Sequence, residues 1–181
     1  MIKQNGHDLV VVGAGVIGLS VALAGLRRQW RVLVIERHEA AVGASIRNFG
    51  FVTVTGQKRG GHWRRAMRTR DLWLELADQA GIKIEHQGLT LVAKRPLAGD
   101  VLYEFAQTEM GQDCSFLTKQ QAQDKLPGLN SGTSFSEFLY SPHELRIESA
   151  KAIGQFAQWL EQQGVAFRFS TSAFDLTGQG I

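Results

Sequence analysis

Cysteine and proline are scarce in this sequence of 181 residues, which contains one cysteine, Cys114, and three prolines. A single cysteine excludes a disulfide scaffold and a thiolate metal cluster, and the shortage of proline excludes a proline-rich linker. The five histidines are scattered along the chain without the spacing of a metal site. We therefore expect no bound metal ion, and we expect the Cys114 thiol to be inert.

Charged residues are missing from one long segment, Leu9–Leu26, which is close to the length of a membrane span. The segment also resembles a short signal peptide, because Lys3 precedes it and Ala22-Leu23-Ala24 provides a possible cleavage site. Glycines interrupt it at positions 13, 15 and 18, however, and a buried strand followed by a buried helix face lacks charge in the same way. The pattern favours a cytoplasmic protein without an integral membrane segment.

Positive charge is concentrated in one short segment, residues 58–70, which contains no acidic residue. The whole chain carries a net charge of +3, but outside this segment acidic residues outnumber basic ones. A nucleic-acid-binding surface usually needs a wider basic area, so we expect no nucleic-acid partner. The basic residues of the segment are Lys58, Arg59, Arg64, Arg65, Arg68 and Arg70.

The order of apolar runs and glycines predicts an α/β fold. Residues 8–12 and 31–36 are typical of buried parallel strands, and residues 16–29 of a helix between them, which together make a right-handed βαβ unit. A long glycine-rich loop follows at 43–61, and such loops are usually functional. Farther along we expect helices at 61–80, 98–110, 118–126 and 149–163, two strands within 82–95 that turn near Gln87-Gly88, and strands at 135–140, 145–147, 165–169 and 173–177.

The turn after the first expected strand has the sequence Gly13-Ala14-Gly15-Val16-Ile17-Gly18, which matches G-x-G-x-x-G. The motif follows a strand and opens a helix, and Glu36 ends the next strand, which is the context of a dinucleotide site. Gly13 allows the tight turn, Gly15 lets the backbone approach a pyrophosphate, and Gly18 lets the helix pack on the sheet. The Glu36 carboxylate suits a ribose diol and disfavours a 2′-phosphate. A structural βαβ unit with incidental glycines is the alternative.

Several stretches after the βαβ unit are distinctive. Glu36-Arg37 is followed by a Gly-Ala-Ser-x-Arg-Asn-x-Gly run at 43–50, and later by Leu72-Trp73, Gly88-Leu89 and the run from Tyr140 to Arg146. In these residues, and over nearly all of its length, the chain resembles the FAD-dependent D-amino-acid oxidase family, which includes glycine and sarcosine oxidases and bacterial amino-acid dehydrogenases. The stretches 47–50, 55–57 and 141–146 are similar to a bacterial subgroup linked to organophosphonate breakdown.

The resemblance implies a Rossmann-like FAD-binding domain at residues 1–81 and 148–181, with an inserted α+β substrate domain at residues 82–147. Members of the family are considerably longer, so the resemblance also implies that this chain is a truncated, N-terminal half. The cofactor it implies is FAD. The implied FAD-binding residues are Gly13, Gly15, Val16, Ile17, Gly18, Glu36, Arg37, Ser45, Arg47, Asn48, Phe49, Gly50, Phe51 and Ala173.

The implied activity is oxidation of a small amine or amino acid at its C–N bond, with hydride passing to flavin N5. No catalytic residue is predicted. An NAD-linked dehydrogenase and a non-catalytic dinucleotide-binding or interaction fragment are the alternatives. We expect that these 181 residues alone are not a competent oxidase, because half a pocket neither excludes water nor holds the substrate. Apolar surface left uncovered would also favour self-association.

Three more residues are candidates for the substrate side. Arg70 lies in the middle of an apolar helical face that includes Trp63 and Met67. A guanidinium in that position needs a partner, so Arg70 is either a structural residue bonded to a carboxylate or loop carbonyls, or a residue near the flavin loop or an anionic substrate group. His143 and Arg146 lie in a stretch that resembles the edge of the substrate domain, and either is a candidate for facing the pocket.

Overall fold

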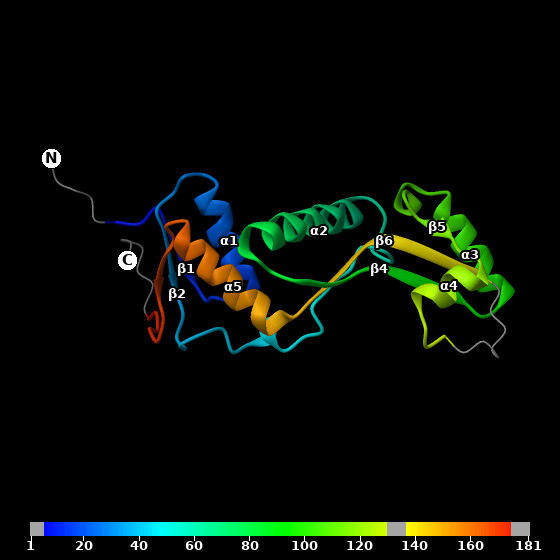
Figure 1. Ribbon diagram of the computed structural model, residues 1–181. Helices are drawn as coiled ribbons and strands as arrows, with labels where there is room; N and C mark the ends of the chain where they lie inside the picture. Colours follow the sequence, from blue (N-terminus) through cyan, green and yellow to red (C-terminus); the bar gives the residue numbers. More distant parts are fainter. Residues whose placement is uncertain (1–5, 130–136, 175–181) are drawn as a thin grey trace. The chain divides into compact units, whose positions relative to one another are not determined.

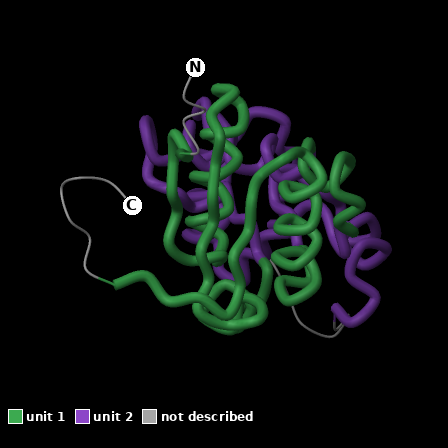
Figure 2. The backbone as a smooth tube through the Cα atoms, turned by 90° about the vertical axis from the view of Figure 1, so that its left-hand side faces the viewer, with its two compact units in different colours: residues 1–50, 75–83, 147–181 green, residues 51–74, 84–146 purple. Residues whose placement is uncertain are grey.

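The structure is a computed structural model that describes residues 6–129 and 137–174 (Figure 1). The chain divides into two compact units, which Figure 2 shows in different colours. Unit 1 contains residues 1–50, 75–83 and 147–181, and unit 2 contains residues 51–74 and 84–146. Residues 51–74, which the sequence analysis groups with the FAD-binding segment, therefore belong to unit 2. The boundaries of the functional domains stay predictions.

Unit 1 is built on a parallel sheet whose described strands are β1 (Leu9–Val12), β2 (Val32–Ile35) and β7 (Ala166–Arg168). β2 lies between the other two, with Leu9 opposite Val32 and Leu33 opposite Ala166. All four β2 residues are buried, as is typical of a central parallel strand. This sheet and the helices that connect its strands confirm the predicted α/β fold.

Helix α1 (Val16–Leu26) connects β1 to β2 and packs against both strands (Figure 1). The uncharged segment Leu9–Leu26 is thus a strand, a tight turn and a helix. Within the described ranges, no helix is both long enough and apolar enough to cross a bilayer.

Helix α5 (Ser149–Gln162) leads into β7 and ends in a glycine motif. Gly164 has a φ of 96° and donates its N–H to the Glu161 carbonyl at 2.9 Å. The next N–H, from Val165, reaches the Leu160 carbonyl at 3.0 Å, so the two bonds complete a Schellman motif. The expected helix at 149–163 is confirmed, and the motif at its end directs the chain back into the sheet.

Unit 2 contains a second sheet, in which β6 (Glu137–Ile147) lies between β3 (Phe51–Val52) and β4 (Ile84–Ala93). A short strand, β5 (Ser115–Phe116), also pairs with β6. β6 is one continuous strand, so the expectation of separate strands at 135–140 and 145–147 is wrong over the residues that the structure describes. Pro142 lacks an N–H, and it lies between the β6 residues that pair with β5 and those that pair with β3, so neither of these two pairings needs it.

β4 is also continuous, so the predicted strand turn near Gln87-Gly88 is wrong. Gly88 has a φ of 90°, yet the chain keeps its direction through it. A Cβ at Gly88 would overlap the hydroxyl and ring of Tyr140. The glycine therefore serves a close approach of an aromatic ring to the strand rather than a reversal of the chain.

The other helices are α2 (Gly61–Ala80), α3 (Pro96–Ala106) and α4 (Lys119–Lys125). α4 starts with a capping box in which Thr118 and Gln121 exchange hydrogen bonds, at the start of the helix expected at 118–126. The helix expected at 98–110 ends earlier, at Ala106, and is followed by a 3₁₀ turn, η2 (Glu109–Gly111). A second 3₁₀ turn, η1 (Ala44–Ile46), lies in the glycine-rich loop. Of the strands expected at 135–140 and 173–177, residues 135–136 and 175–177 lie outside the described residues, and Ala173 and Phe174 are not in a strand.

Asp8 and Arg31 lock the start of the parallel sheet together. The Arg31 backbone N–H donates to the Asp8 carboxylate at 2.8 Å, and its guanidinium donates at 2.9 and 3.1 Å. The side-chain bond, followed by the backbone bond, lowers the Asp8 pKa from 3.8 to about 2. Because this pKa is lowered on folding, the pair stabilises the fold above pH 3.8, and that contribution is lost as the pH falls toward 2.

We predict that Arg31→Gln returns the Asp8 titration toward pH 3.8 and lowers stability slightly at neutral pH, since the pair is exposed. NMR titration of the aspartate carboxyl carbons measures the midpoint. Arg64→Gln, which removes an exposed arginine of unit 2, is the control and should leave the midpoint unchanged. A midpoint near the usual value in the unaltered chain would contradict the prediction.

Candidate functional site

The turn between β1 and α1 needs glycine at two positions for different reasons. Gly13 has a φ of 106°, and its N–H donates to the Ile35 carbonyl at 2.8 Å, which holds the turn to the end of β2. A Cβ at Gly18 would overlap the Gly13 carbonyl oxygen and come within 3.2 Å of Val11 Cγ1. Gly18 therefore lets the first turn of α1 lie directly against the strand it leaves.

Several backbone N–H groups at the N-terminus of α1 have no hydrogen-bond acceptor in the described residues. In the described parts of the chain, the N–H groups of Gly15, Ile17 and Gly18 have no protein acceptor. The Val16 N–H donates to the Ser45 hydroxyl at 2.9 Å. Unfilled N–H groups and the helix dipole make such a terminus attractive to an anionic group such as a phosphate.

Ser45 comes from the glycine-rich loop and approaches the turn closely. A Cβ at Gly15 would lie 2.9 Å from the Ser45 oxygen, so a side chain at residue 15 would crowd the Ser45 hydroxyl where it meets the helix. Val16 and Ser45 are 29 residues apart in the sequence, yet the structure brings both of them together with Gly15. The sequence analysis places all three residues in one site.

Glu36, at the end of β2, connects the second strand to the same turn. One carboxylate oxygen accepts the Ala14 N–H at 2.9 Å, and the other accepts the His38 N–H at 3.1 Å. Each oxygen keeps a further lone pair, so the carboxylate can also accept hydroxyl donors. Beside it is a cavity of about 400 Å³, lined by Val12, Gly13, Ile35, Glu36, Arg37, Thr171, Ser172, Ala173 and Phe174.

The Asn48 side chain stabilises the loop at residues 44–50 through hydrogen bonds. Its amide NH₂ donates to the carbonyls of Ala44 at 3.0 Å and Ser45 at 2.9 Å, and its Oδ1 accepts from the Gly50 N–H and the Ser149 hydroxyl, both at 2.8 Å. All four hydrogen-bonding positions of the side chain are filled. Asn48 therefore shapes the loop with its side chain and offers a ligand only its backbone.

The remaining predicted site residues of the loop differ in exposure. Gly50 is buried, and a Cβ there would overlap the Ile147 carbonyl oxygen. Arg47 is exposed, as are Phe49 and Phe51, whose exposed fractions are 79% and 62%. Large exposed aromatic rings are unusual on a protein surface unless something covers them.

In unit 2, Arg70 has a carboxylate partner, as expected if it is a structural residue rather than one near the flavin loop or the substrate. One guanidinium nitrogen donates to His143 Nδ1 at 2.9 Å, and another pairs with Asp71 at 2.6 Å. Arginine can only donate, so His143 Nδ1 accepts, and the proton is on Nε2, which donates to the Gln112 carbonyl at 2.9 Å. His143 is almost fully buried, at 2% exposure. Its neutral ring connects α2 to the segment before β5 and does not face a pocket.

Next to His143 lies a group of buried polar residues that the sequence analysis missed. Ser141 accepts the Thr55 hydroxyl at 2.8 Å, and one oxygen of Glu144 accepts the N–H groups of Val54 and Thr55 at 3.3 and 2.5 Å. Burial raises the pKa of the nearby Cys114 thiol above 9.0, although a hydrogen bond to Ser141 acts in the opposite direction. The raised pKa disfavours the reactive thiolate. The available signal was the polar sequence 141–144 inside an otherwise apolar strand.

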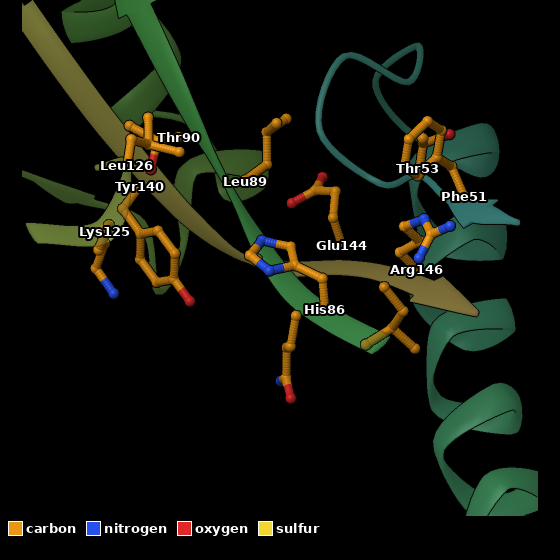
Figure 3. Close-up of a pocket in the computed structure, with 13 residues that line it drawn as sticks. Phe51, Thr53, His86, Leu89, Thr90, Lys125, Leu126, Tyr140, Glu144 and Arg146 are labelled. Carbon is orange, nitrogen blue, oxygen red and sulfur yellow. The ribbon is translucent and has the colours of Figure 1, made fainter. Parts of the chain in front are cut away.

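The open face of the second sheet carries a cavity of about 340 Å³ (Figure 3). Arg146 lies at one end with Phe51 and Thr53, and Lys125 lies at the other end with Tyr140. Leu89, His86 and Glu144 lie between the two ends. Of the two pocket candidates in the 140–146 segment, Arg146 thus lines a cavity, and His143 does not. The basic residues Lys125 and His86 were not predicted.

A sequence profile of the family described as "FAD dependent oxidoreductase" matches residues 8–181. The chain belongs to this family. FAD is therefore its cofactor, and the NAD alternative loses its support. The turn suits FAD, because three N–H groups at the α1 terminus have no acceptor in the described chain.

Solved structures show the same fold. Glycine oxidase from Geobacillus kaustophilus is 24% identical, with a TM-score of 0.73, and the match covers 93% of this chain and 48% of that one. L-amino acid deaminase from Proteus myxofaciens, in complex with anthranilate, is 17% identical with a TM-score of 0.78, and the match covers 95% of this chain and 40% of that one. L-α-glycerophosphate oxidase from Mycoplasma pneumoniae, with FAD bound, is 20% identical with a TM-score of 0.72, and the match covers 91% of this chain and 44% of that one. The chain spans about half the length of these proteins or less, and no curated protein sequence matches it significantly.

We predict that Gly18→Ala destabilises unit 1 by about 1–3 kcal/mol, because the added methyl group must push α1 away from the turn. Gly154→Ala in α5 is the matched control: its Cβ would meet nothing within 4 Å, and alanine should stabilise the helix by about 0.5–1 kcal/mol. Urea denaturation of both variants measures the difference. Equal effects of the two substitutions would contradict the packing argument.

For unit 2, we predict that His143→Leu destabilises the fold by about 1–3 kcal/mol for each partner it leaves unpaired, the Arg70 guanidinium and the Gln112 carbonyl. Arg68→Met, an exposed change on the same helix, should stay within about 0.5 kcal/mol. Chemical denaturation distinguishes the two. If His143→Leu is no worse than the control, the proposed link between these elements is wrong.

Proposed function

We propose that the protein containing this chain is an FAD-dependent oxidoreductase that oxidises the C–N bond of a small amine or amino acid. One observation carries the proposal: three backbone N–H groups at the start of α1 have no acceptor in the described chain, and they lie at the end of the parallel sheet where a dinucleotide binds. The amine class is supported by the relatives, which include a glycine oxidase and an L-amino acid deaminase.

In this proposal the chain binds the FAD dinucleotide in two parts. The N–H groups of Gly15, Ile17 and Gly18 receive the pyrophosphate, with the Ser45 hydroxyl beside it. The Glu36 carboxylate, held in place by two backbone N–H groups, accepts the ribose hydroxyls, and Arg37 and Ala173 line the adenosine cavity. When bound, FAD supplies a hydride acceptor at flavin N5.

The flavin side of the proposed site is the loop from Arg47 to Phe51. The Asn48 bonds fix the loop backbone, and the exposed Phe49 and Phe51 rings provide apolar cover for a flat ring system. Aminophosphonates belong among the candidate substrates because of the sequence stretches shared with the phosphonate-linked subgroup. We place the activity in the cytoplasm, with a small molecule and no nucleic acid as its partner.

The cofactor assignment predicts that Glu36→Gln weakens FAD binding by about 1.5–3 kcal/mol, because a charged acceptor of ribose hydroxyls is lost. Gly15→Val should weaken it more, since its side chain enters the space of the pyrophosphate and of Ser45. Glu39→Gln, an exposed acid nearby, is the control. Quenching of flavin fluorescence on binding measures each dissociation constant. Unchanged affinity in both test variants would refute the assignment.

The substrate class is tested by anaerobic mixing of the flavin-loaded protein with glycine, sarcosine, D-amino acids, L-amino acids and aminophosphonates. Bleaching of the flavin absorbance by one of these groups identifies the class. Bleaching only by glycerol phosphate or another alcohol would move the activity to C–O oxidation. Stoichiometric flavin that no amine reduces would favour a non-catalytic dinucleotide-binding module.

A further inference from the structure

Helix α3 of unit 2 (Figure 1) has one face that no described residue covers. Residues spaced by three and four positions share one face of a helix, and here these are Leu97, Asp100, Val101 and Glu104. All four are exposed, and the exposed fractions of Leu97 and Val101 are 76% and 57%. On the opposite side of the helix, Gly99 is buried and Leu102 is half-buried. We call the exposed side the outer face of α3.

The outer face has an apolar centre. Leu97 and Val101 are one helical turn apart, so their side chains are neighbours and form one continuous apolar surface. Water solvates such a surface poorly, and covering it by another apolar surface is favourable. The packing of unit 2 does not cover it within the described residues, so the outer face has contact area to offer to a partner.

Charged residues lie at the two ends of this apolar centre. Lys94 lies five residues before Gly99, and Glu104 lies five residues after it. Both side chains are exposed, and neither has an ion pair within residues 6–129 and 137–174. Leu97 and Val101 are likewise equally distant from Gly99, at two residues on either side. The outer face is therefore balanced about Gly99, with apolar residues near it and opposite charges farther out.

We infer that the outer face of α3 binds the same face of a second copy of this chain, with the two helices antiparallel and centred on Gly99. Leu97 of each copy then packs against Val101 of the other, and Lys94 of each copy faces Glu104 of the other, because a two-fold interface repeats every contact. A parallel pair would instead place Lys94 beside Lys94 and Glu104 beside Glu104. The charges thus select a second copy in the antiparallel direction.

The association is expected to be weak. One short helix from each copy makes an interface smaller than that of a stable dimer. Asp100 also opposes it, because antiparallel pairing about a two-fold axis brings the two Asp100 side chains to the same edge of the interface. The inference goes beyond the proposed function and does not depend on it, since every residue that it uses lies in unit 2.

The apolar contact is tested by analytical ultracentrifugation of the 181-residue chain over a range of concentrations. We expect a monomer–dimer equilibrium that Leu97→Gln weakens at least about tenfold, because each substitution removes two symmetric contacts. Val42→Gln, which changes an exposed apolar residue of unit 1, is the control and should leave the equilibrium unchanged. A chain that stays monomeric, or equal weakening by both substitutions, would overturn the inference.

The antiparallel direction is tested by exchanging the two charges. Lys94→Glu and Glu104→Lys should each weaken association about tenfold, because both replace two attractive pairs with two repulsive ones. The double variant should restore it, since opposite charges face each other again. Lys151→Glu, on the exposed side of α5, is the matched control. Restoration also keeps the test valid if Leu97→Gln fails to fold, and its absence would overturn the antiparallel pairing.

Two further results bear on the partner. Asp100→Asn should strengthen association about twofold to fivefold, because it removes the repulsion between the two carboxylates; weaker association would contradict the arrangement. A longer protein that contains this chain should also dimerise and respond to Leu97→Gln. If that protein is a monomer, another of its segments covers the outer face, and the inference is wrong.

Discussion

The first unit depends on how closely helix α1 approaches the turn that starts it. With no side chain at Gly18, the helix rests on the Gly13 carbonyl, and Gly13 is itself tied to the end of β2. That contact sets the start of the helix at the end of the parallel sheet, directly after the turn that the Glu36 carboxylate holds through the Ala14 N–H. The proposed site for a phosphate and a ribose therefore depends on one steric condition.

The second unit depends on a competition for charged groups. Buried backbone N–H groups must be satisfied, and those of Val54 and Thr55 take the Glu144 carboxylate. Arg70 pairs with His143 and Asp71 through its two terminal nitrogens, while its Nε is buried without a partner in the described structure. These pairings are structural, and within the described residues they leave the Arg146 guanidinium without an ion pair or hydrogen bond on a cavity wall that also includes Lys125.

The sequence was most informative where one residue type has one physical use. Gly13, Gly18 and Glu36 indicated a dinucleotide turn because few structures need a positive φ, a missing Cβ and a strand-end carboxylate in that order. The turn expected near Gln87-Gly88 was wrong because glycine often marks the end of a strand. In β4, Gly88 instead gives the Tyr140 ring room to approach a continuous strand.

By itself, the sequence determined the α/β class, the order of the main helices and strands, the dinucleotide turn and the family, since these depend on spacing along the chain. Only the tertiary structure decided which polar side chains are structural and which face a cavity. Arg70, His143, Glu144 and Arg146 are all polar residues in apolar surroundings, and the sequence pattern does not distinguish them. Their roles depend on partners up to 90 residues away, which meet only when the sheets form.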